Sequence, residues 1–347
     1  MIGLWDTTGN EVVKALAAER RSAGGVASGM ALTLIVVVDE KRVREAEAAA
    51  TIAAAAHPCR LLVVVRSDVE REQSRLDAEI VVGGRLGPCE AVVMRMYGRL
   101  ALHAESVVMP LLVPDVPVVT WWHSEPPSQI ANDFLGVVAD RRITDAAQAI
   151  NPIDALRQRA RDYAPGDTDL AWTRITPWRT LVAGAFDTTA ARVTEATVVA
   201  PSTDPTAALM IGWLTARLGI EPRWQDTNDY ARMRSVELDC ANGDRLVLTR
   251  ENNTAIFERT GQADRHLPLT RRPLGDELAE ELRRLDADQI YAQALSASTG
   301  LTGLDDRPGQ RVHIWNDPTA ARRAAVPAGA PGSTPVAAPA GSGGPAQ

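Results

Sequence analysis

The residues best suited to chemistry lie in a ten-residue stretch, 118–127, that begins with a β-branched run and ends in paired prolines. Between these limits stand Trp121, Trp122, His123 and Glu125. Large amphipathic rings beside an imidazole and a carboxylate on a loop suit the recognition of another molecule. A structural role for the two rings is an equal alternative, because side chains alternate along a strand and one ring would then enter the core while the other faces outward.

A second group interleaves Trp172 and Trp178 with Arg174 and Arg179. Tryptophan and arginine are the residue types that most often anchor protein interfaces. Packing between two domains is the competing interpretation, at even odds. The two groups together give the residues predicted to contact a partner: Trp121, Trp122, His123, Glu125, Trp172, Arg174, Trp178 and Arg179.

Two arginine pairs have plainer interpretations. Asp140, Arg141 and Arg142, followed by Asp145, are expected to form an ion-paired, solvated sheet edge, which we favour over an anion clamp. Arg271 and Arg272 are expected in a solvated turn before a helix.

Catalytic and cofactor signatures are missing from the sequence. The glycine clusters do not follow a strand and open a helix as a phosphate-binding loop requires, and Asp39 and Glu40 stand where a pyrophosphate would bind. The five histidines show no metal-ligand spacing, and there is no nucleophile elbow. We therefore predict no catalytic residues, no cofactor and no metal, and hence a protein that is not an enzyme.

Composition narrows the functional classes further. The net charge of −7 is spread along the 347 residues without a basic face, so nucleic acid is not expected as a partner. Three cysteines without a Cys-x-x-Cys pair suit buried thiols in a reducing compartment. The N-terminus lacks the features of a signal peptide, and no apolar run is long enough for a membrane span. A soluble, cytoplasmic protein without membrane contact is expected.

The first half reads as an α/β domain, residues 1–165. Strands over 32–38 and 61–65 flank an alanine-rich helix over 41–56, which predicts a parallel, right-handed βαβ unit. Further elements of this half are expected as strands over 78–82, 91–96, 117–122 and 134–139 and as helices over 6–21, 98–109 and 151–163. The fold class is therefore α/β, with a mostly parallel, helix-covered sheet.

The second half reads as a smaller α+β domain, residues 166–305. Asn242-Gly243 predicts a tight hairpin between strands 235–240 and 245–249. Further elements are expected as a helix over 169–185, a strand over 193–200, a helix capped by Ser202 or Thr203 and ended by Gly219, a strand over 254–258, and a helix over 274–294. Residues 306–347 are expected to be an extended segment and a disordered Pro-, Gly- and Ala-rich tail.

Four short motifs together resemble the actinobacterial OpcA family, the glucose-6-phosphate dehydrogenase assembly proteins. They are Leu4-Trp-Asp-Thr-Thr-Gly9, Ala56-His-Pro-Cys-Arg60, Thr120-Trp-Trp-His-Ser-Glu-Pro-Pro127 and Asp140-Arg-Arg-Ile-Thr-Asp145. The resemblance covers about residues 1 to 300 and implies a non-enzymatic partner that promotes assembly or allosteric activation of glucose-6-phosphate dehydrogenase, in the pentose phosphate pathway. Cyanobacterial members are associated with thiol-based redox control, and the three scattered cysteines here do not support carrying that control over.

Two functions therefore stand at the level of sequence. The first is a non-catalytic protein that binds glucose-6-phosphate dehydrogenase and favours its active oligomer. The alternative is an enzyme or ligand sensor that binds a small anionic metabolite or nucleotide at the strand-end crevice, where open α/β sheets bind ligands.

Overall fold

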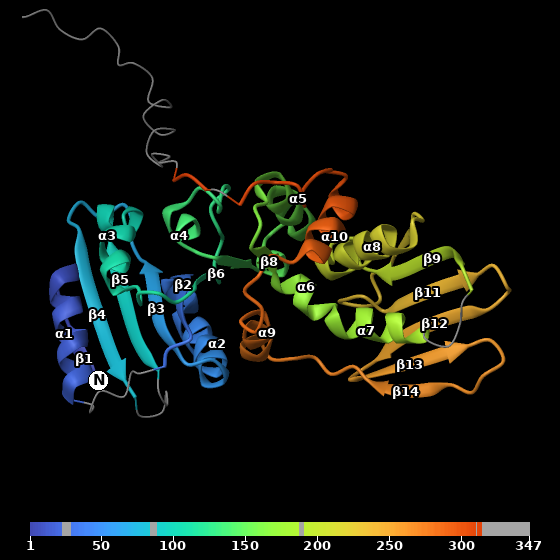
Figure 1. The fold of residues 1–347 in the computed structure, drawn as a ribbon, viewed down its shortest axis with the longest axis horizontal. Coiled ribbons are helices and arrows are strands. Elements are labelled where there is room, and N and C mark those ends of the chain that lie inside the picture. The colour runs from blue at the N-terminus through green and yellow to red at the C-terminus, as the bar shows by residue number, and fades with distance from the viewer. Residues whose placement is uncertain (23–28, 84–88, 187–190, 310, 314–347) are drawn as a thin grey trace, which may run out of the picture. The chain divides into compact units, whose positions relative to one another are not determined.

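Two β-sheets with helices packed against them make up the part of the chain described by the computed structural model (Figure 1). The described residues are 1–22, 29–83, 89–186, 191–309 and 311–313. One sheet has eight strands and the other six, which confirms the expected α/β class. The tail predicted to be disordered lies outside the described residues from position 314 onward.

The eight-stranded sheet is mostly parallel, as expected. Its order is β1 (Ile2–Leu4), β4 (Arg75–Val82), β5 (Glu90–Tyr97), β3 (Cys59–Arg66), β2 (Leu32–Asp39), β6 (Val118–Trp122), β7 (Arg141–Thr144) and β8 (Asp167–Asp169). Neighbouring strands from β5 to β8 run parallel, whereas β1 and β4 pair antiparallel at one side. The predicted βαβ unit is present: β2 and β3 are parallel neighbours, joined through α2 (Val43–Ala56).

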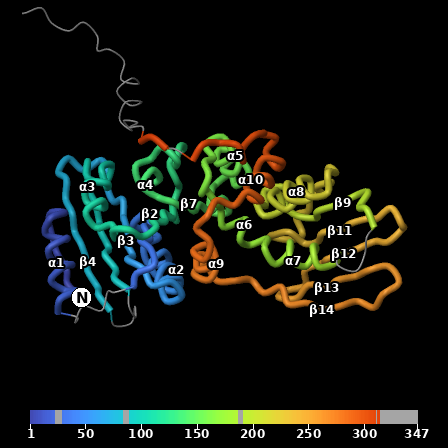
Figure 2. The backbone as a smooth tube through the Cα atoms, in the orientation of Figure 1, coloured from blue at the N-terminus to red at the C-terminus, as the bar shows by residue number. Residues whose placement is uncertain are grey.

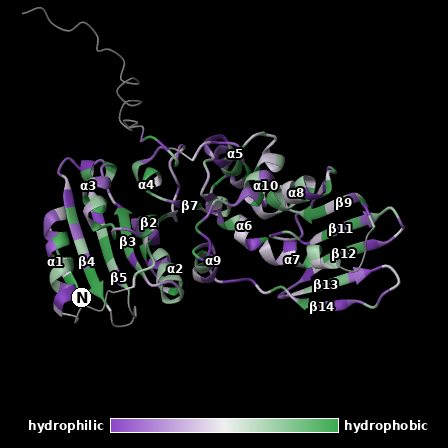
Figure 3. Cartoon of the chain, in the orientation of Figure 1, coloured by the Kyte–Doolittle hydropathy of each residue, from purple (hydrophilic) through white to green (hydrophobic). Residues whose placement is uncertain are grey.

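Both faces of this sheet are covered, which explains why β2 and β3 are continuous apolar runs. Ile35 and Val37 of β2 pack in a core with α1 (Gly9–Ser22), α3 (Glu105–Val108) and α4 (Phe134–Val137). Leu34 and Val36 pack in a second core with α2 and α9 (Leu274–Glu281). Figure 3 shows the hydrophobic colouring of the inner strands of this sheet, in contrast to the hydrophilic β14.

The six-stranded sheet carries the third core. Its order is β10 (Arg223–Asp226), β9 (Val193–Ala200), β11 (Ser235–Cys240), β12 (Arg245–Glu251), β13 (Thr254–Arg259) and β14 (Arg265–Pro268). The predicted hairpin between β11 and β12 is confirmed, with Gly243 at a φ of 85°. The helices that share this core are α5 (Pro152–Asp162), α6 (Leu170–Arg174), α7 (Thr176–Ala185), α8 (Pro205–Leu218) and α10 (Gln289–Thr299).

The expected division after residue 165 does not follow the two sheets. Strand β8 lies beyond it yet belongs to the first sheet, and α5 lies before it yet packs in the core of the second. Helix α9 comes after the second sheet in the chain and packs on α2 (Figure 2). The approach is close: a Cβ at Gly275 would lie 2.6 Å from the Cβ of Ile52. A division into domains 1–165 and 166–305 therefore remains a prediction.

Three expected elements differ. The strand predicted over 134–139 is wrong: Asp133 accepts a hydrogen bond from the amide of Leu135 and starts α4 instead. The helix predicted over 98–109 is broken into the 3₁₀ turn Gly98–Leu102, α3 and the 3₁₀ turn Met109–Leu111, with His103 outside the helical region at a φ of −118° and a ψ of 43°. The helix predicted over 274–294 is two helices, since Asp288 caps a new one, α10. Asp204, not Ser202 or Thr203, caps α8.

Candidate functional site

Four of the six parallel strands, β2, β6, β7 and β8, lie side by side and end at one edge of the first sheet. The polar residues there are Asp39 at the end of β2, His123 after β6, Asp145 after β7 and Asp169 at the end of β8. The chain leaves β2 for β3 on one side and later returns to β6 on the other, so the strand order reverses beside β2. Such an edge is where open α/β sheets usually bind ligands.

His123 is buried at this edge. Its Nε2 lies 3.2 Å from a carboxylate oxygen of Glu45 on α2, and its ring centroid is 4.8 Å from that of Trp121. Burial lowers the pKa of His123, and the nearby Glu45 opposes that shift only in part. Glu125, two residues on, is exposed. The geometry therefore favours a neutral imidazole that holds α2 to the end of β6.

Trp121 and Trp122 lie in different cores. Trp121 is fully buried against α2 and α9, and Trp122 is buried on the opposite face with α1 and α4. The expectation that one ring faces outward is wrong, because helices cover both faces of the sheet. The two side chains do point to opposite faces of the strand, but each face packs in a hydrophobic core.

The second tryptophan–arginine group is also directed inward. Trp172 and Trp178 are buried, and the Arg179 guanidinium lies 3.5 Å from the centroid of the Trp172 ring. The indole N–H of Trp172 donates to Asp288 at 2.8 Å. Burial lowers the pKa of Arg179 to about 10. These contacts match the packing interpretation, and a partner contact by these rings remains a prediction.

Arg174 joins segments that are far apart in the chain. Its two Nη groups donate to Asp145 at 2.6 and 2.7 Å, and its Nε donates to both carboxylate oxygens of Glu277 at 2.9 and 3.0 Å. Burial alone would lower the pKa of Arg174, but these charge-assisted hydrogen bonds outweigh it and raise the pKa above its usual value. The result is a fixed connection between α6, the end of β7 and α9.

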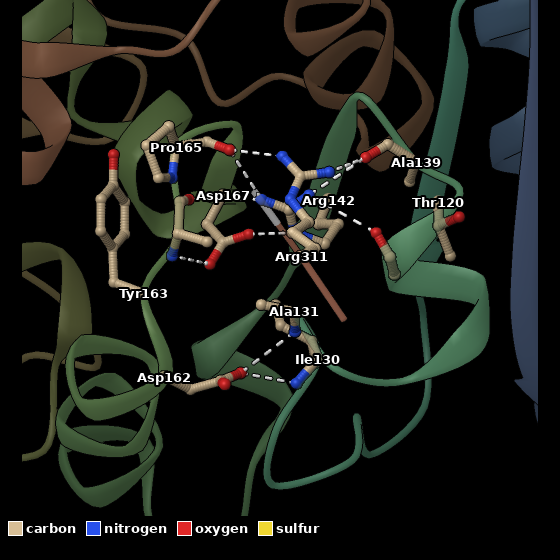
Figure 4. A network of polar contacts seen from close by, with 12 residues as sticks. Thr120, Ile130, Ala131, Ala139, Arg142, Asp162, Tyr163, Pro165, Asp167 and Arg311 are labelled. Carbon is tan, nitrogen blue, oxygen red and sulfur yellow. Dashed lines mark hydrogen bonds and ion pairs between the residues drawn. The ribbon is translucent and has the colours of Figure 1, made fainter. Parts of the chain in front are cut away.

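A related network lies around β7 and β8. Figure 4 shows the Arg142 guanidinium facing Asp167, and it also donates to the carbonyls of Ala139 at 3.1 Å and Pro165 at 2.8 Å. Arg141 is paired with Glu281 in the same way. The ion pairing expected for this edge is confirmed, but the expected solvation is wrong: Arg141 is 3% exposed and Arg142 is 0% exposed.

Asp162 extends this network to the loop before α4. Its carboxylate accepts hydrogen bonds from the amides of Ile130 at 2.5 Å and Ala131 at 3.4 Å (Figure 4). Burial raises the pKa of Asp162 to about 6, and burial likewise raises that of Asp169 to about 6. Both carboxyl groups therefore titrate above their usual range.

A cavity of about 350 Å³ opens beside Arg174 and Trp178. Arginines from separate segments line it: Arg232 from the loop before β11, Arg250 from β12, and Arg271 from the loop before α9. The Arg250 guanidinium lies 5.1 Å from the centroid of the Trp178 ring. Burial and the charge of Arg271 lower the pKa of Arg232, and burial and the charge of Arg232 lower that of Arg250. The site, called the arginine cavity below, thus gathers like charges.

Sequence reasoning missed most of this cavity. Arg174 and Trp178 were singled out, whereas Arg271 and Arg272 were expected only in a solvated turn, and both are exposed at the cavity. Arg232 and Arg250 were not predicted, because Arg232, Arg250 and Arg271 lie 18 to 39 positions apart and leave no local pattern in the sequence. The three cysteines are buried free thiols, as expected. In the described ranges, no helix is both long and apolar enough to cross a membrane, and no group of three or more metal-ligating side chains is gathered.

Comparison with known families gives two matches. A family model described as the glucose-6-phosphate dehydrogenase subunit N-terminal domain matches residues 50–161, and one described as the C-terminal domain of that subunit matches residues 165–295. Both models carry the OpcA name, and the first is also named for glucose-6-phosphate dehydrogenase assembly. The names indicate an assembly or regulatory protein in preference to a catalyst.

Two curated relatives are each named a putative OxPP cycle protein OpcA. The one from Synechocystis sp. is 27% identical over 184 residues, which is 49% of this chain and 39% of the relative. The one from Synechococcus elongatus is 31% identical over 144 residues, which is 39% of this chain and 32% of the relative. The matches thus span less than half the length of these relatives, and because both are cyanobacterial the actinobacterial type remains a prediction.

Among solved structures, a 3-ketoreductase from Actinomadura kijaniata in complex with NADP and TDP-benzene aligns with a TM-score of 0.44 at 13% identity, covering 78% of this chain and 95% of that one. An NAD-binding oxidoreductase from Klebsiella pneumoniae aligns with a TM-score of 0.34 at 10% identity, covering 79% and 90%. TM-scores this low support no inference about chemistry. The two family models, by contrast, follow one another along residues 50–295, and the chain therefore belongs to the OpcA family of glucose-6-phosphate dehydrogenase assembly proteins.

Proposed function

We propose that this chain binds glucose-6-phosphate dehydrogenase and, in the cytoplasm, favours its active oligomer without catalysing a reaction itself. The observation that carries the proposal is the pair of family matches, each named for that dehydrogenase. An activator must bind the active state of its partner more tightly than the inactive state, since equal binding shifts nothing. A tenfold change in the ratio of the two states needs only about 1.4 kcal/mol of differential affinity.

Trp5 is the exposed residue best placed to supply such affinity. Its side chain is 64% exposed, and it stands in the first of the four motifs that resemble the family. Of the residues first expected at the interface, Glu125 is exposed, whereas Trp121, Trp122, His123, Trp172 and Trp178 are buried. Buried rings can support a contact with the dehydrogenase only indirectly, by stabilising the fold beneath the exposed surface.

The turn that presents Trp5 is held on several sides. The amide of Asp6 donates to Asp77 at 2.9 Å, with Asp6 at a φ of 50°, and the amide of Thr7 donates to the carbonyl of Leu76 at 2.9 Å. Thr8 and Glu11 then exchange amide hydrogen bonds across the first turn of α1, in the manner of a capping box. An aromatic ring on a fixed turn loses little conformational entropy on binding, which suits an interface anchor.

The test is titration of purified glucose-6-phosphate dehydrogenase with this chain, with readouts of dehydrogenase activity and of oligomer size by light scattering. The Trp5→Ala variant is expected to raise the concentration for half-maximal activation by about tenfold or more, and Trp5→Phe by less. Ile150→Ala, which trims another highly exposed apolar side chain, serves as the control. Activity and size that stay constant over the whole titration would remove the proposed function, and an unaltered Trp5→Ala titration would remove only this contact.

A further inference from the structure

We propose that the arginine cavity is a binding site for a small phosphate monoester, a ligand that goes beyond the proposed function. The first observation is its charge. The lining holds five arginines, Arg174, Arg232, Arg250, Arg271 and Arg272, against the carboxylates of Asp204 and Glu277, in a chain whose net charge is −7.

The carboxylates of the lining are already engaged. Glu277 is bound to Arg174, and Asp204 accepts hydrogen bonds from the amides of Thr206 at 2.8 Å and Met233 at 2.7 Å. Arg272 lies 3.4 Å from Glu280. Among the described residues, no carboxylate lies within ion-pair distance of Arg232, Arg250 or Arg271. Three guanidinium groups thus remain for an external anion.

The position of Arg250 is set from within the protein. Its side chain is half-buried with its guanidinium against the Trp178 ring, and its Nε is buried without a hydrogen-bond partner in the described part of the chain. An unpartnered donor in such a place costs free energy unless an acceptor binds. Arg232 and Arg271 come from other segments and line the same cavity, so three guanidinium groups can serve the several oxygens of one phosphate.

The remaining lining suits a small polar ligand. Thr203 and Thr270 add hydroxyl groups to the lining. A volume of about 350 Å³ is at the lower end of the range of roughly 300–1,000 Å³ typical of metabolite sites. The chemistry therefore points to a phosphate carried on a short polyhydroxylated body.

The experiment is isothermal titration of the isolated full chain at low ionic strength with glucose 6-phosphate, ribose 5-phosphate, inorganic phosphate and uncharged glucose. At least one sugar phosphate is expected to bind at one site per chain and more tightly than inorganic phosphate, and glucose is expected not to bind. The Arg250→Gln and Arg232→Gln variants are each expected to weaken that binding by about tenfold or more, which corresponds to about 1.4 kcal/mol.

The matched control is Arg245→Gln, which removes an arginine from the same strand as Arg250 but one that is paired with Glu237 and Asp239 outside the cavity. Its affinity is expected to equal that of the unmodified chain, and circular dichroism would establish that all three variants fold. Absence of saturable sugar-phosphate binding, sugar phosphates that bind no more tightly than inorganic phosphate, or an equal loss in Arg245→Gln would each overturn the proposal.

A third arm separates this site from the proposed function, because the titration uses no dehydrogenase. If the isolated chain binds no phosphate monoester while Arg250→Gln weakens binding of the dehydrogenase, the cavity holds an acidic side chain of that partner, and the ligand proposal is overturned. If the chain binds a sugar phosphate but not the dehydrogenase, the ligand proposal is supported and the proposed function is overturned.

Discussion

The buried ion pairs of Arg141, Arg142 and Arg174, called the network below, and the arginine cavity use the same type of side chain in opposite ways. In the network, Arg141, Arg142 and Arg174 are each matched by a carboxylate within the chain. In the cavity, Arg232, Arg250 and Arg271 gather without one among the described residues. A buried charge must be compensated, so the internal ion pairs of the network have a structural role. In the cavity, Arg232 and Arg271 are exposed and Arg250 is half-buried, so these charges are open to solvent and to an external anion. Geometry thus separates arginines that are paired within the chain from arginines that are not.

The largest effect is expected from Arg142→Met. The change leaves Asp167 buried without its charged partner, and breaking a buried pair in this way costs about 3–5 kcal/mol. Urea unfolding at neutral pH, followed by circular dichroism, measures the loss. A loss below about 1 kcal/mol in the free energy of unfolding would mean that these buried ion pairs do not stabilise the fold.

Arg174→Lys is expected to cost about 2 kcal/mol in the free energy of unfolding. A lysine keeps the charge but has no planar fork, so it cannot serve Asp145 and Glu277 together. The same urea titration measures it, with Arg245→Lys on the exposed face of β12 as the control. A lysine variant as stable as the original would show that charge alone, without fork geometry, maintains this connection.

The pH dependence of stability offers a third comparison. The pKa of Asp162 is raised to about 6 in the folded state, so the folded protein binds this proton more tightly than the unfolded chain does. Its contribution is therefore greatest at low pH and is lost as pH rises from about 4 to about 6, by an amount on the order of 1 kcal/mol after solvent screening.

Asp162→Asn removes that titration while its side-chain oxygen can still accept from the amides of Ile130 and Ala131. Urea unfolding at a series of pH values is expected to show a shallower slope over this window in the variant. Asp169, whose pKa is also raised to about 6, contributes to the slope that remains, as do Asp133 and Asp167, whose pKa values burial also raises. Identical slopes in both proteins would contradict the assignment to Asp162.

The smallest effect on stability is expected in the cavity. Arg232→Gln removes one of several like charges and no ion pair, so the free energy of unfolding should change by no more than about 0.5 kcal/mol. If the variant is slightly more stable at low salt but not at high salt, the change has relieved repulsion between the cavity arginines. A loss comparable to that of Arg142→Met would abolish the distinction between the two regions.

The sequence predicted what local chemistry decides. The apolar runs of β2 and β3 and the Asn242-Gly243 hairpin carry their signals within a few residues, and all three are present. Short polar strands such as β7 and β8 were not predicted, because they are held by neighbours that are remote in the chain. Trp121 and Trp122 were expected on opposite faces, which is right, but only the fold reveals that both faces are covered. The cavity arginines converge through tertiary structure and leave no local pattern.

The position of α9 also bears on how the chain acquires its structure during synthesis. The face of α2 that meets Leu278 and Leu282 is complete once residue 56 has been made, but its cover is encoded more than 200 residues later. At translation rates of about 5–20 residues per second, this apolar face waits roughly 10 to 45 seconds for its cover. The nascent chain therefore passes through a period in which the second core is open on one side, and chaperones have their best opportunity to bind it then.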